Sequence, residues 1–396
     1  MNMSKPRIFV DGRVFDTEYQ GTRTYIHNLY EIIDRLGDFE IFLASSDPAN
    51  AAGFFPDASN IHFVAYRTAS KIRRVMRELP EMMGRYKIDA AHYQYIVPPV
   101  KNCLQVVTIH DLLFKDFPGE FSMRYRMIKG AAFYLSARRA DLVTTVSDYS
   151  KKAIVRHFGI PQEDVHVVPN GVSPFFFESY DKEGSRKKVS GQFGISNYIL
   201  YVSRIEPRKN QLDLLQSYLD LELHLQGKSL VFVGKESIPV PQIRAIIDTL
   251  PGEISNKIFF LENISNTDLR LLYQAADLFV YPSKGEGFGI PPLEAAALGV
   301  PTICSNTTAM SDFTFFGSNH ISPDREALKR SIVSALASQP KNLREISHAV
   351  KQGYGWDTAA MTMNELLWDK VGKRREYFPG LQVKTLPTHK ISKLLK

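Results

Sequence analysis

The sequence predicts an α/β fold made of two Rossmann-like, doubly wound domains, each built on a mostly parallel sheet and facing the other across a cleft. Short apolar runs, which indicate buried strands, alternate with segments whose apolar residues recur at helical spacing. This alternation occurs twice, and 396 residues are enough for two domains of ordinary size.

The two halves contain their elements in a similar order. In the first half we expect strands at 8–10, 40–44, 61–65, 106–109 and 142–146, and helices at 21–36 and 148–158, the second with Ser147 as its N-cap. In the second half we expect strands at 199–202, 230–233, 258–261, 278–281 and 302–305, and helices at 210–225, 267–275 and 291–298. The charged and aromatic segment 174–188 has no clear period and indicates a linker.

Composition excludes several classes of protein. The chain is 44% hydrophobic and 23% charged, which is typical of a globular protein. Its two cysteines, Cys103 and Cys304, lack metal-ligand spacing and favour a reducing compartment. We recognise no signal peptide, no apolar run approaches the roughly 18 residues of a membrane span, and no nucleic-acid-binding motif is evident. We therefore expect a cytoplasmic protein.

The net charge of +7 is concentrated in three segments. Residues 67–87 contain seven Lys/Arg, 123–139 contain five without any acid, and 370–396 contain eight. Such segments are either solvated helix faces or sites for an anionic surface. We expect peripheral binding to the inner face of an anionic membrane.

The glycine-rich segment after the strand at 278–281 carries the most chemical information. Glu286 and Glu294 are separated by seven residues within a loop and helix start that contain three glycines and two prolines. A helix N-terminus after a glycine-rich turn favours an anion, whereas carboxylates accept hydrogen bonds from hydroxyls. The combination predicts a site for a sugar nucleotide; two surface glutamates on an ordinary strand–turn–helix are the alternative.

The segment E-G-F-G-I-P-P-L-E-A-A-A-L-G-V-P resembles the Glu-x7-Glu signature of the family 4 retaining glycosyltransferases, which have the GT-B fold. Overall the chain is similar to bacterial O-antigen and polysaccharide mannosyltransferases. The resemblance implies that Glu286 contacts the transferred sugar and Glu294 the ribose, with Phe288, Gly289 and Ile290 in the same donor-binding loop.

Two further pairs of residues follow predicted strands. Arg204 and Lys209 come after the strand at 199–202, where their charges could stabilise a departing diphosphate. The resemblance gives them that role, and a basic helix start is the alternative. His110 and Asp111 follow the strand at 106–109 and resemble the family's His-Asp pair, whose His faces the transferred sugar. Asp111 could orient the imidazole or cap a turn.

Three weaker candidates rest on the resemblance. Gly21 matches a glycine-rich turn near the donor phosphate, although relatives often have more glycines there. Ile264 matches the loop against the nucleobase, and Asn170, in Pro-Asn-Gly, is a possible site or hinge residue. The implied organisation is an acceptor-binding domain (1–177), a linker (178–194), a nucleotide-sugar domain (195–355), a closing helix (356–378) and a basic tail (379–396).

We therefore predict a retaining hexosyltransferase with His110 and Glu286 as catalytic residues. Our best guess for the donor is GDP-mannose, and for the acceptor a lipid-linked glycan of a cell-surface polysaccharide. No Asp-x-Asp motif or His/Cys cluster is present, so we expect no metal and no cofactor, and we assign no protein nucleophile. The alternatives are a sugar-nucleotide epimerase or a phosphorylase on the same fold, or a non-catalytic protein that binds nucleotide sugars or polyanions.

Overall fold

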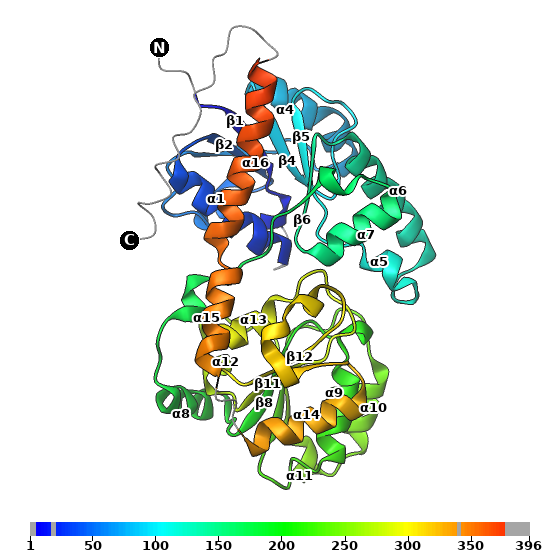
Figure 1. Ribbon diagram of the computed structural model, residues 1–396, viewed down its shortest axis with the longest axis vertical. Coiled ribbons are helices and arrows are strands. Elements are labelled where there is room, and N and C mark those ends of the chain that lie inside the picture. Colours follow the sequence, from blue (N-terminus) through cyan, green and yellow to red (C-terminus); the bar gives the residue numbers. More distant parts are fainter. Residues whose placement is uncertain (1–4, 17–20, 339–341, 377–396) are drawn as a thin grey trace. The chain divides into compact units, whose positions relative to one another are not determined.

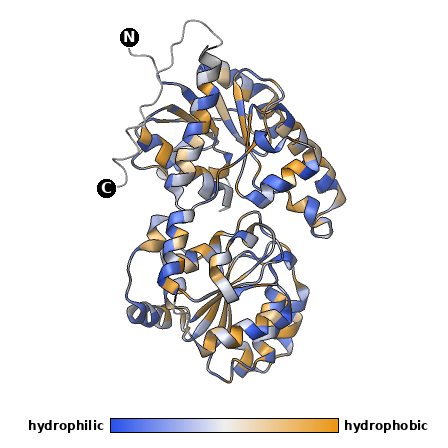
Figure 2. Ribbon diagram, in the orientation of Figure 1, coloured by the Kyte–Doolittle hydropathy of each residue, from blue (hydrophilic) through white to orange (hydrophobic). Residues whose placement is uncertain are grey.

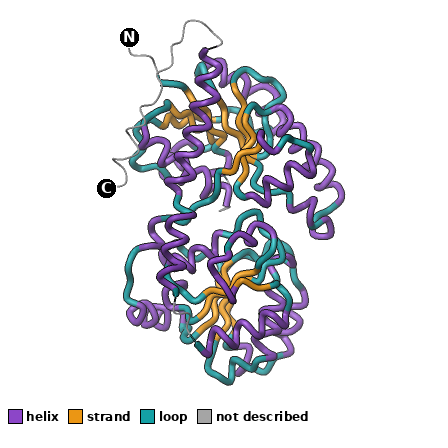
Figure 3. The backbone as a smooth tube through the Cα atoms, in the orientation of Figure 1, coloured by secondary structure: helices purple, strands orange, loops and turns teal. Residues whose placement is uncertain are grey.

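The computed structural model describes residues 5–16, 21–338 and 342–376. They form two compact units. Of the described residues, the first contains 5–16, 21–108, 135–144 and 360–376, and the second contains 109–134, 145–338 and 342–359. The chain contains two parallel α/β sheets, and Figure 3 shows the strands of each sheet as a central layer between helices.

The first sheet has seven strands in the order β3-β2-β1-β4-β5-β6-β7. Its strands are β1 (Arg7–Asp11), β2 (Glu40–Ser45), β3 (Ile61–Ala65), β4 (Ala90–Gln94), β5 (Leu104–Thr108), β6 (Leu142–Thr145) and β7 (Val165–Val167). The helices along this part of the chain are α1 (Gly21–Leu36), α2 (Pro48–Gly53), α3 (Lys71–Arg73), α4 (Leu79–Arg85), α5 (Leu113–Asp116), α6 (Met123–Arg139) and α7 (Asp148–Phe158) (Figure 1). A π-helical turn, Arg74–Glu78, joins α3 to α4.

The second sheet has six strands in the order β10-β9-β8-β11-β12-β13. They are β8 (Tyr198–Val202), β9 (Ser229–Val233), β10 (Ile258–Leu261), β11 (Leu278–Tyr281), β12 (Thr302–Ser305) and β13 (His320–Ile321). The later helices are α8 (Lys182–Phe193), α9 (Gln211–Asp220), α10 (Pro241–Thr249), α11 (Gly252–Ser255), α12 (Asn266–Ala275), α13 (Ile290–Ala297), α14 (Arg325–Ala337), α15 (Leu343–Gly353) and α16 (Trp356–Glu376).

Burial explains why the strand predictions succeed. The strands of the second sheet are mostly in hydrophobic colours in Figure 2, and β8, β9, β11 and β12 are almost completely buried. Strands covered on both faces read as continuous apolar runs. Every strand expected from such a run is present, with end points that differ by at most two residues.

Three strands were not predicted: β4, β7 and β13. β4 contains His92 and Gln94, whose polarity hides the strand, yet both are buried. His92 is satisfied by Tyr30 (2.8 Å to Nδ1) and by Thr108 (2.7 Å to Nε2). Internal hydrogen bonds therefore allow a polar sequence in a central strand.

Two other segments differ from the expected pattern. The helix expected at 210–225 ends at Asp220, and the chain then turns through Glu222 and Gly227, both at positive φ. The range 178–194 contains α8, which packs against α12. α16 occupies the range of the expected closing helix, whereas the basic tail at 379–396 lies outside the described residues.

Candidate functional site

The candidate site lies where β8 and β11 end, in the second unit. The order of the second sheet reverses direction between these two neighbouring strands. In doubly wound sheets this switch point leaves a crevice outside the carboxyl ends of the strands, where ligands bind. One loop, residues 203–210, leaves β8, and a second, residues 282–289, leaves β11 and enters α13.

Glu286 is the centre of a buried polar cluster. Its Oε1 accepts hydrogen bonds from Lys209 Nζ (2.6 Å), Ser283 Oγ (2.7 Å) and Tyr281 Oη (2.9 Å). Its Oε2 lies 3.6 Å from a guanidinium nitrogen of Arg208. One carboxylate oxygen is thus saturated by donors, while the other has a single, more distant cation.

The charges in this cluster stabilise each other. Burial alone disfavours the Glu286 carboxylate, but Lys209 and Arg208 outweigh it and lower the pKa of Glu286 to about 2. Burial lowers the pKa of Lys209, and Glu286 opposes that effect. Glu286 is therefore an anion at neutral pH, and Lys209 is its closest cation.

The backbone around Lys209 is held by several side chains. A short 3-10 turn, Pro207–Lys209, ends at Asn210, whose φ of 63° is left-handed. Tyr201 on β8 donates to the carbonyl oxygen of Lys209 (2.8 Å), and its ring stacks on Tyr281 of β11. The two strands therefore place Lys209 and Glu286 together through directly packed aromatic residues.

Sequence analysis missed Arg208 and Glu206, which tie the two loops together. Arg208 is buried and donates to the Gly285 carbonyl oxygen and to Glu206 (3.0 Å). Glu206 also accepts from Ser237 (2.7 Å). The run Glu-Pro-Arg-Lys offered an adjacent cation as a signal, but nothing in it separated a buried Arg208 from a solvated one.

Arg204 has a different environment from Lys209. Its side chain is 59% exposed, and its Nε lies 3.5 Å from Glu206. Gln211 donates to its backbone carbonyl oxygen (2.8 Å), which fixes the loop while the guanidinium extends towards solvent. The two predicted cations therefore lie on one loop, with Lys209 engaged and Arg204 accessible.

The glycines of the 282–289 loop allow close contacts. Gly289 has φ of 100°, and a Cβ there would lie 2.8 Å from Met310. A Cβ at Gly287 would lie 2.8 Å from Asp111, and Ser147 Oγ donates to the Gly287 carbonyl oxygen (2.7 Å). The loop is thus pinned against its neighbours before α13 begins at Ile290.

Phe288 and Glu294 flank this loop. Phe288 is buried and packs edge-on against Phe313 and Tyr354, so it anchors the loop. Glu294, on α13, accepts from Tyr273 Oη (3.0 Å). Burial raises the pKa of Glu294 to about 7, only partly offset by that hydrogen bond. The carboxyl of Glu294 therefore titrates near neutral pH, whereas Glu286 is ionised there.

His110 and Asp111 follow β5 and lie in the same unit as Glu286. Burial lowers the pKa of His110 to about 3, so its imidazole is neutral at neutral pH. Ser150 Oγ donates to its carbonyl oxygen (2.9 Å). Asp111 accepts from the backbone N–H of Leu113 (3.1 Å), as a turn cap does, and burial raises its pKa.

The remaining predicted residues lie elsewhere in the fold. Gly21 begins α1 in the first unit, and a Cβ there would meet nothing within 4 Å. Ile264 follows β10 and the left-handed Asn263. Asn170 is buried, with no hydrogen-bond partner for its Oδ1 among the described residues.

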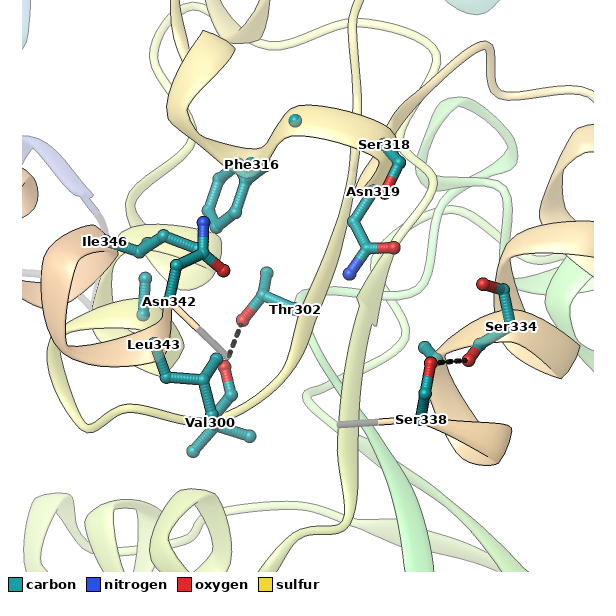
Figure 4. A pocket seen from close by; sticks show the side chains of 13 residues that line it. Val300, Thr302, Phe316, Ser318, Asn319, Ser334, Ser338, Asn342, Leu343 and Ile346 are labelled. Atoms are coloured by element: carbon teal, nitrogen blue, oxygen red, sulfur yellow. Dashed lines mark hydrogen bonds between the residues drawn. The ribbon is translucent and has the colours of Figure 1, made fainter. Parts of the chain in front are cut away.

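A cavity of about 350 Å³ lies elsewhere in the second unit, between α13, α14 and α15 (Figure 4). Phe316, Asn319, Thr302 and Asn342 are among the residues that line it, and none of the lining side chains among the described residues is charged. The described residues therefore give this cavity no cation for a diphosphate, whereas the loops at β8 and β11 carry Arg204, Arg208 and Lys209.

The described part of the chain contains no cluster of metal ligands, since no group of three or more His, Cys, Asp or Glu residues there could hold a metal ion. None of the helices in residues 5–16, 21–338 and 342–376 combines the length and apolar character that crossing a membrane requires.

Two family models of glycosyltransferases match successive parts of the chain. A family model described as Glycosyltransferase Family 4 matches residues 19–174, and one described as Glycosyl transferases group 1 matches residues 183–352. The second match contains Arg204, Lys209, Glu286 and Glu294.

Two curated relatives are O-antigen mannosyltransferases. O-antigen chain mannosyltransferase B of Escherichia coli is 31% identical over 247 residues, which are 62% of this chain and 64% of that protein. O-antigen chain mannosyltransferase RfbU of Salmonella typhimurium is 26% identical over 268 residues, which are 66% and 68% of the two chains. The alignment thus covers slightly less than two thirds of the first relative.

A solved structure shares the fold along nearly the whole chain. A glycosyltransferase from Rickettsia africae superposes with a TM-score of 0.71 at 18% identity, over 93% of this chain and 99% of that one. The architecture of two parallel-sheet domains is therefore the GT-B fold.

Proposed function

Since the chain belongs to the glycosyltransferases, with a family 4 domain followed by a group 1 domain, we propose that it transfers mannose from GDP-mannose to a glycan. The names of its relatives support mannose, and the residues at the ends of β8 and β11 support a nucleotide sugar. These names are those of transferases, so neither the epimerase nor the non-catalytic alternative is favoured.

The observation that carries this proposal is the buried contact between Lys209 and Glu286, 2.6 Å apart at the switch point. A nucleotide sugar brings a diphosphate, which needs cations, and sugar hydroxyls, which need acceptors. On binding, Lys209 exchanges the carboxylate for the diphosphate, and Arg204 adds a second charge from the same loop. Glu286 then accepts hydrogen bonds from hydroxyls of the mannose.

The proposed reaction retains the anomeric configuration. The nucleoside diphosphate leaves from the face that the acceptor hydroxyl attacks, and Lys209 stabilises the charge that develops on it. The neutral His110 hydrogen-bonds a sugar hydroxyl instead of repelling the oxocarbenium-like sugar. The built-in cations Arg204 and Lys209 make a divalent metal unnecessary.

We also propose a lipid-linked acceptor, met at an anionic membrane surface. α6 carries five Lys/Arg and no acid, and it exposes Met123, Met127 and Ile128, each more than half accessible. Exposed apolar side chains among cations are typical of helices that lie in a membrane interface. This would place the protein peripherally on the cytoplasmic face.

A donor and product assay tests the proposal. Purified protein is incubated with GDP-mannose or with other sugar nucleotides, together with lipid-linked glycans, and release of the nucleoside diphosphate is measured. We expect release from GDP-mannose coupled to glycan growth, with an α-mannoside in the product. Release without an acceptor product, or a β-mannoside, would contradict the proposed reaction.

A further inference from the structure

A second polar recess lies in the first unit, where the chain leaves β3 and runs through α3 to α4. The pocket has a volume of about 290 Å³, and four exposed arginines line it: Arg67, Arg73, Arg77 and Arg85. The buried Met82 supplies an apolar wall. The pocket opens at the carboxyl end of β3, the edge of a parallel sheet at which ligands bind.

The four guanidinium groups have no side-chain partner within the described residues. None of them takes part in an ion pair, a side-chain hydrogen bond or a cation–π contact there. Other arginines of the first unit are engaged: Arg7 pairs with Glu40, and Arg13 with Asp11. Among the described residues, Arg7 and Arg13 are thus neutralised by carboxylates, whereas the four guanidiniums that gather around this recess are not.

The carboxylates of the pocket do not neutralise these charges. Glu78 is buried and accepts from the backbone N–H groups of Arg67 and Thr68 (3.2 Å for the second). Glu81 is the other carboxylate, and it is exposed. The recess has four cations and two anions, so its net charge is positive. One of the anions, Glu78, already accepts hydrogen bonds from the backbone of Arg67 and Thr68.

Local structure explains why the arginines gather here. Arg77 and Arg85 lie four residues on either side of Glu81, so the three share one face of the helical segment. The π-helical turn Arg74–Glu78 separates Arg73 from Arg85, and such turns are frequent at functional sites. Arg74 is not part of the recess, because it is buried against the ring of Tyr66 (4.3 Å) and donates to Thr68 O (2.8 Å).

We propose that this pocket binds a phosphate or diphosphate group. Guanidinium forks match phosphate oxygens in a bidentate way, and several forks around one recess favour a multiply charged anion. Such a group can come from a lipid headgroup or from a soluble phosphate compound. The proposal does not depend on the donor site, because binding is measured without donor or turnover.

Arginine footprinting tests the pocket residue by residue. The full chain is treated with phenylglyoxal with and without sodium pyrophosphate, and modified arginines are identified by mass spectrometry. We expect pyrophosphate to protect Arg73, Arg77 and Arg85, and to leave Arg35, an exposed arginine of α1, unprotected. Equal modification of the pocket arginines with and without pyrophosphate would overturn the proposal.

Matched variants separate the pocket from overall charge and from the donor site. In a Lys209→Ala background, in which the proposed donor cation is removed, Arg73→Gln with Arg77→Gln should weaken pyrophosphate binding by about tenfold or more in calorimetry, because charge-assisted bonds are lost. Arg35→Gln with Lys71→Gln removes the same charge outside the recess, and Lys209→Ala disables the proposed donor cation. In both variants, pyrophosphate should still protect Arg73, Arg77 and Arg85 from phenylglyoxal. Loss of this protection in the Arg35/Lys71 variant would overturn a discrete site.

Vesicles then distinguish the two sources of phosphate. Neutral phosphatidylcholine vesicles are prepared with and without a small fraction of a prenyl diphosphate. Recruitment that needs the prenyl diphosphate and is lost in the Arg73/Arg77 variant identifies a lipid headgroup as the ligand. Protection by pyrophosphate without recruitment identifies a soluble phosphate compound, and both results support the site.

Discussion

Replacing Glu286 with Gln tests the role of the central carboxylate with a minimal change in shape. The glutamine Oε1 can still accept from Ser283 and Tyr281, which now donate at 2.7 and 2.9 Å. The charge that opposes Lys209 and Arg208 is lost, as are charge-assisted hydrogen bonds to sugar hydroxyls. Loss of the latter removes about 2–4 kcal/mol of transition-state stabilisation.

The expected change in kcat/KM is therefore a decrease of about 30- to 900-fold, at 1.36 kcal/mol for each factor of ten. Stability also falls, because removing one partner of a buried ion pair costs about 3–5 kcal/mol, and less when a hydrogen-bond acceptor remains. The double variant Glu286→Gln with Lys209→Met should recover part of the stability but none of the activity.

The assay is the initial rate of nucleoside diphosphate release with acceptor present, together with the midpoint of urea unfolding for each variant. Glu253→Gln, which changes an exposed residue of α11, is the matched control and should behave as the parent. A Glu286→Gln enzyme that is folded and within threefold of parental kcat/KM would refute the assignment of this carboxylate to the sugar.

The same loops and helices support three further predictions. Because the pKa of Glu294 is raised to about 7, the carboxyl gains its negative charge as pH rises through 7. The KM for the donor, measured from initial rates, should therefore fall over that pH range. Glu294→Gln should abolish this pH dependence. Lys209→Ala should lower kcat more than it raises the KM for the donor. The parent protein should stay active in excess EDTA. A strict need for added Mg²⁺ or Mn²⁺ would contradict the role of Arg204 and Lys209. Met127→Glu with Ile128→Glu should reduce co-sedimentation with anionic vesicles at low salt, whereas Leu225→Glu with Val333→Glu, which changes exposed apolar residues elsewhere, should not.

Glu286 also influences the stability of the fold at low pH. Its pKa is depressed to about 2 in the folded state, below the usual value of 4.5. The ion pair therefore contributes stability above pH 4.5, and this contribution is lost as pH falls from about 4.5 towards 2. The Glu286→Gln variant should lose less stability than the parent over that interval, as measured by urea unfolding at each pH.

The fold could be predicted from the sequence wherever a buried strand is a continuous apolar run. β8 and β11 are such runs, so the amino-acid pattern alone locates the switch point and the loops that follow it. β4 could not be predicted in this way, because His92 and Gln94 are satisfied by hydrogen bonds that include partners distant in sequence. Long-range hydrogen bonds leave no local pattern.

The candidate site was predictable in part for the same reason. The spacing of Glu286 and Glu294 pointed to both carboxylates, but nothing in the glycine-rich segment showed that Glu286 is buried. That burial depends on Lys209 and Arg208, 77 and 78 residues earlier in the chain. The sequence likewise could not show that Arg73 and Arg77 lack ion-pair partners among the described residues. A basic segment has the same amino-acid pattern whether or not neighbouring carboxylates neutralise its charges.

The most direct test of the central claim is a single comparison of product formation. The parent and the Glu286→Gln variant are each given GDP-mannose and a lipid-linked glycan, and the acceptor is analysed by mass spectrometry for the gain of one hexose. The account predicts this gain, with GDP release in equal amount, for the parent and a loss of at least about 30-fold for the variant. Equal hexose transfer by both proteins, or none by the parent from GDP-mannose, would contradict it.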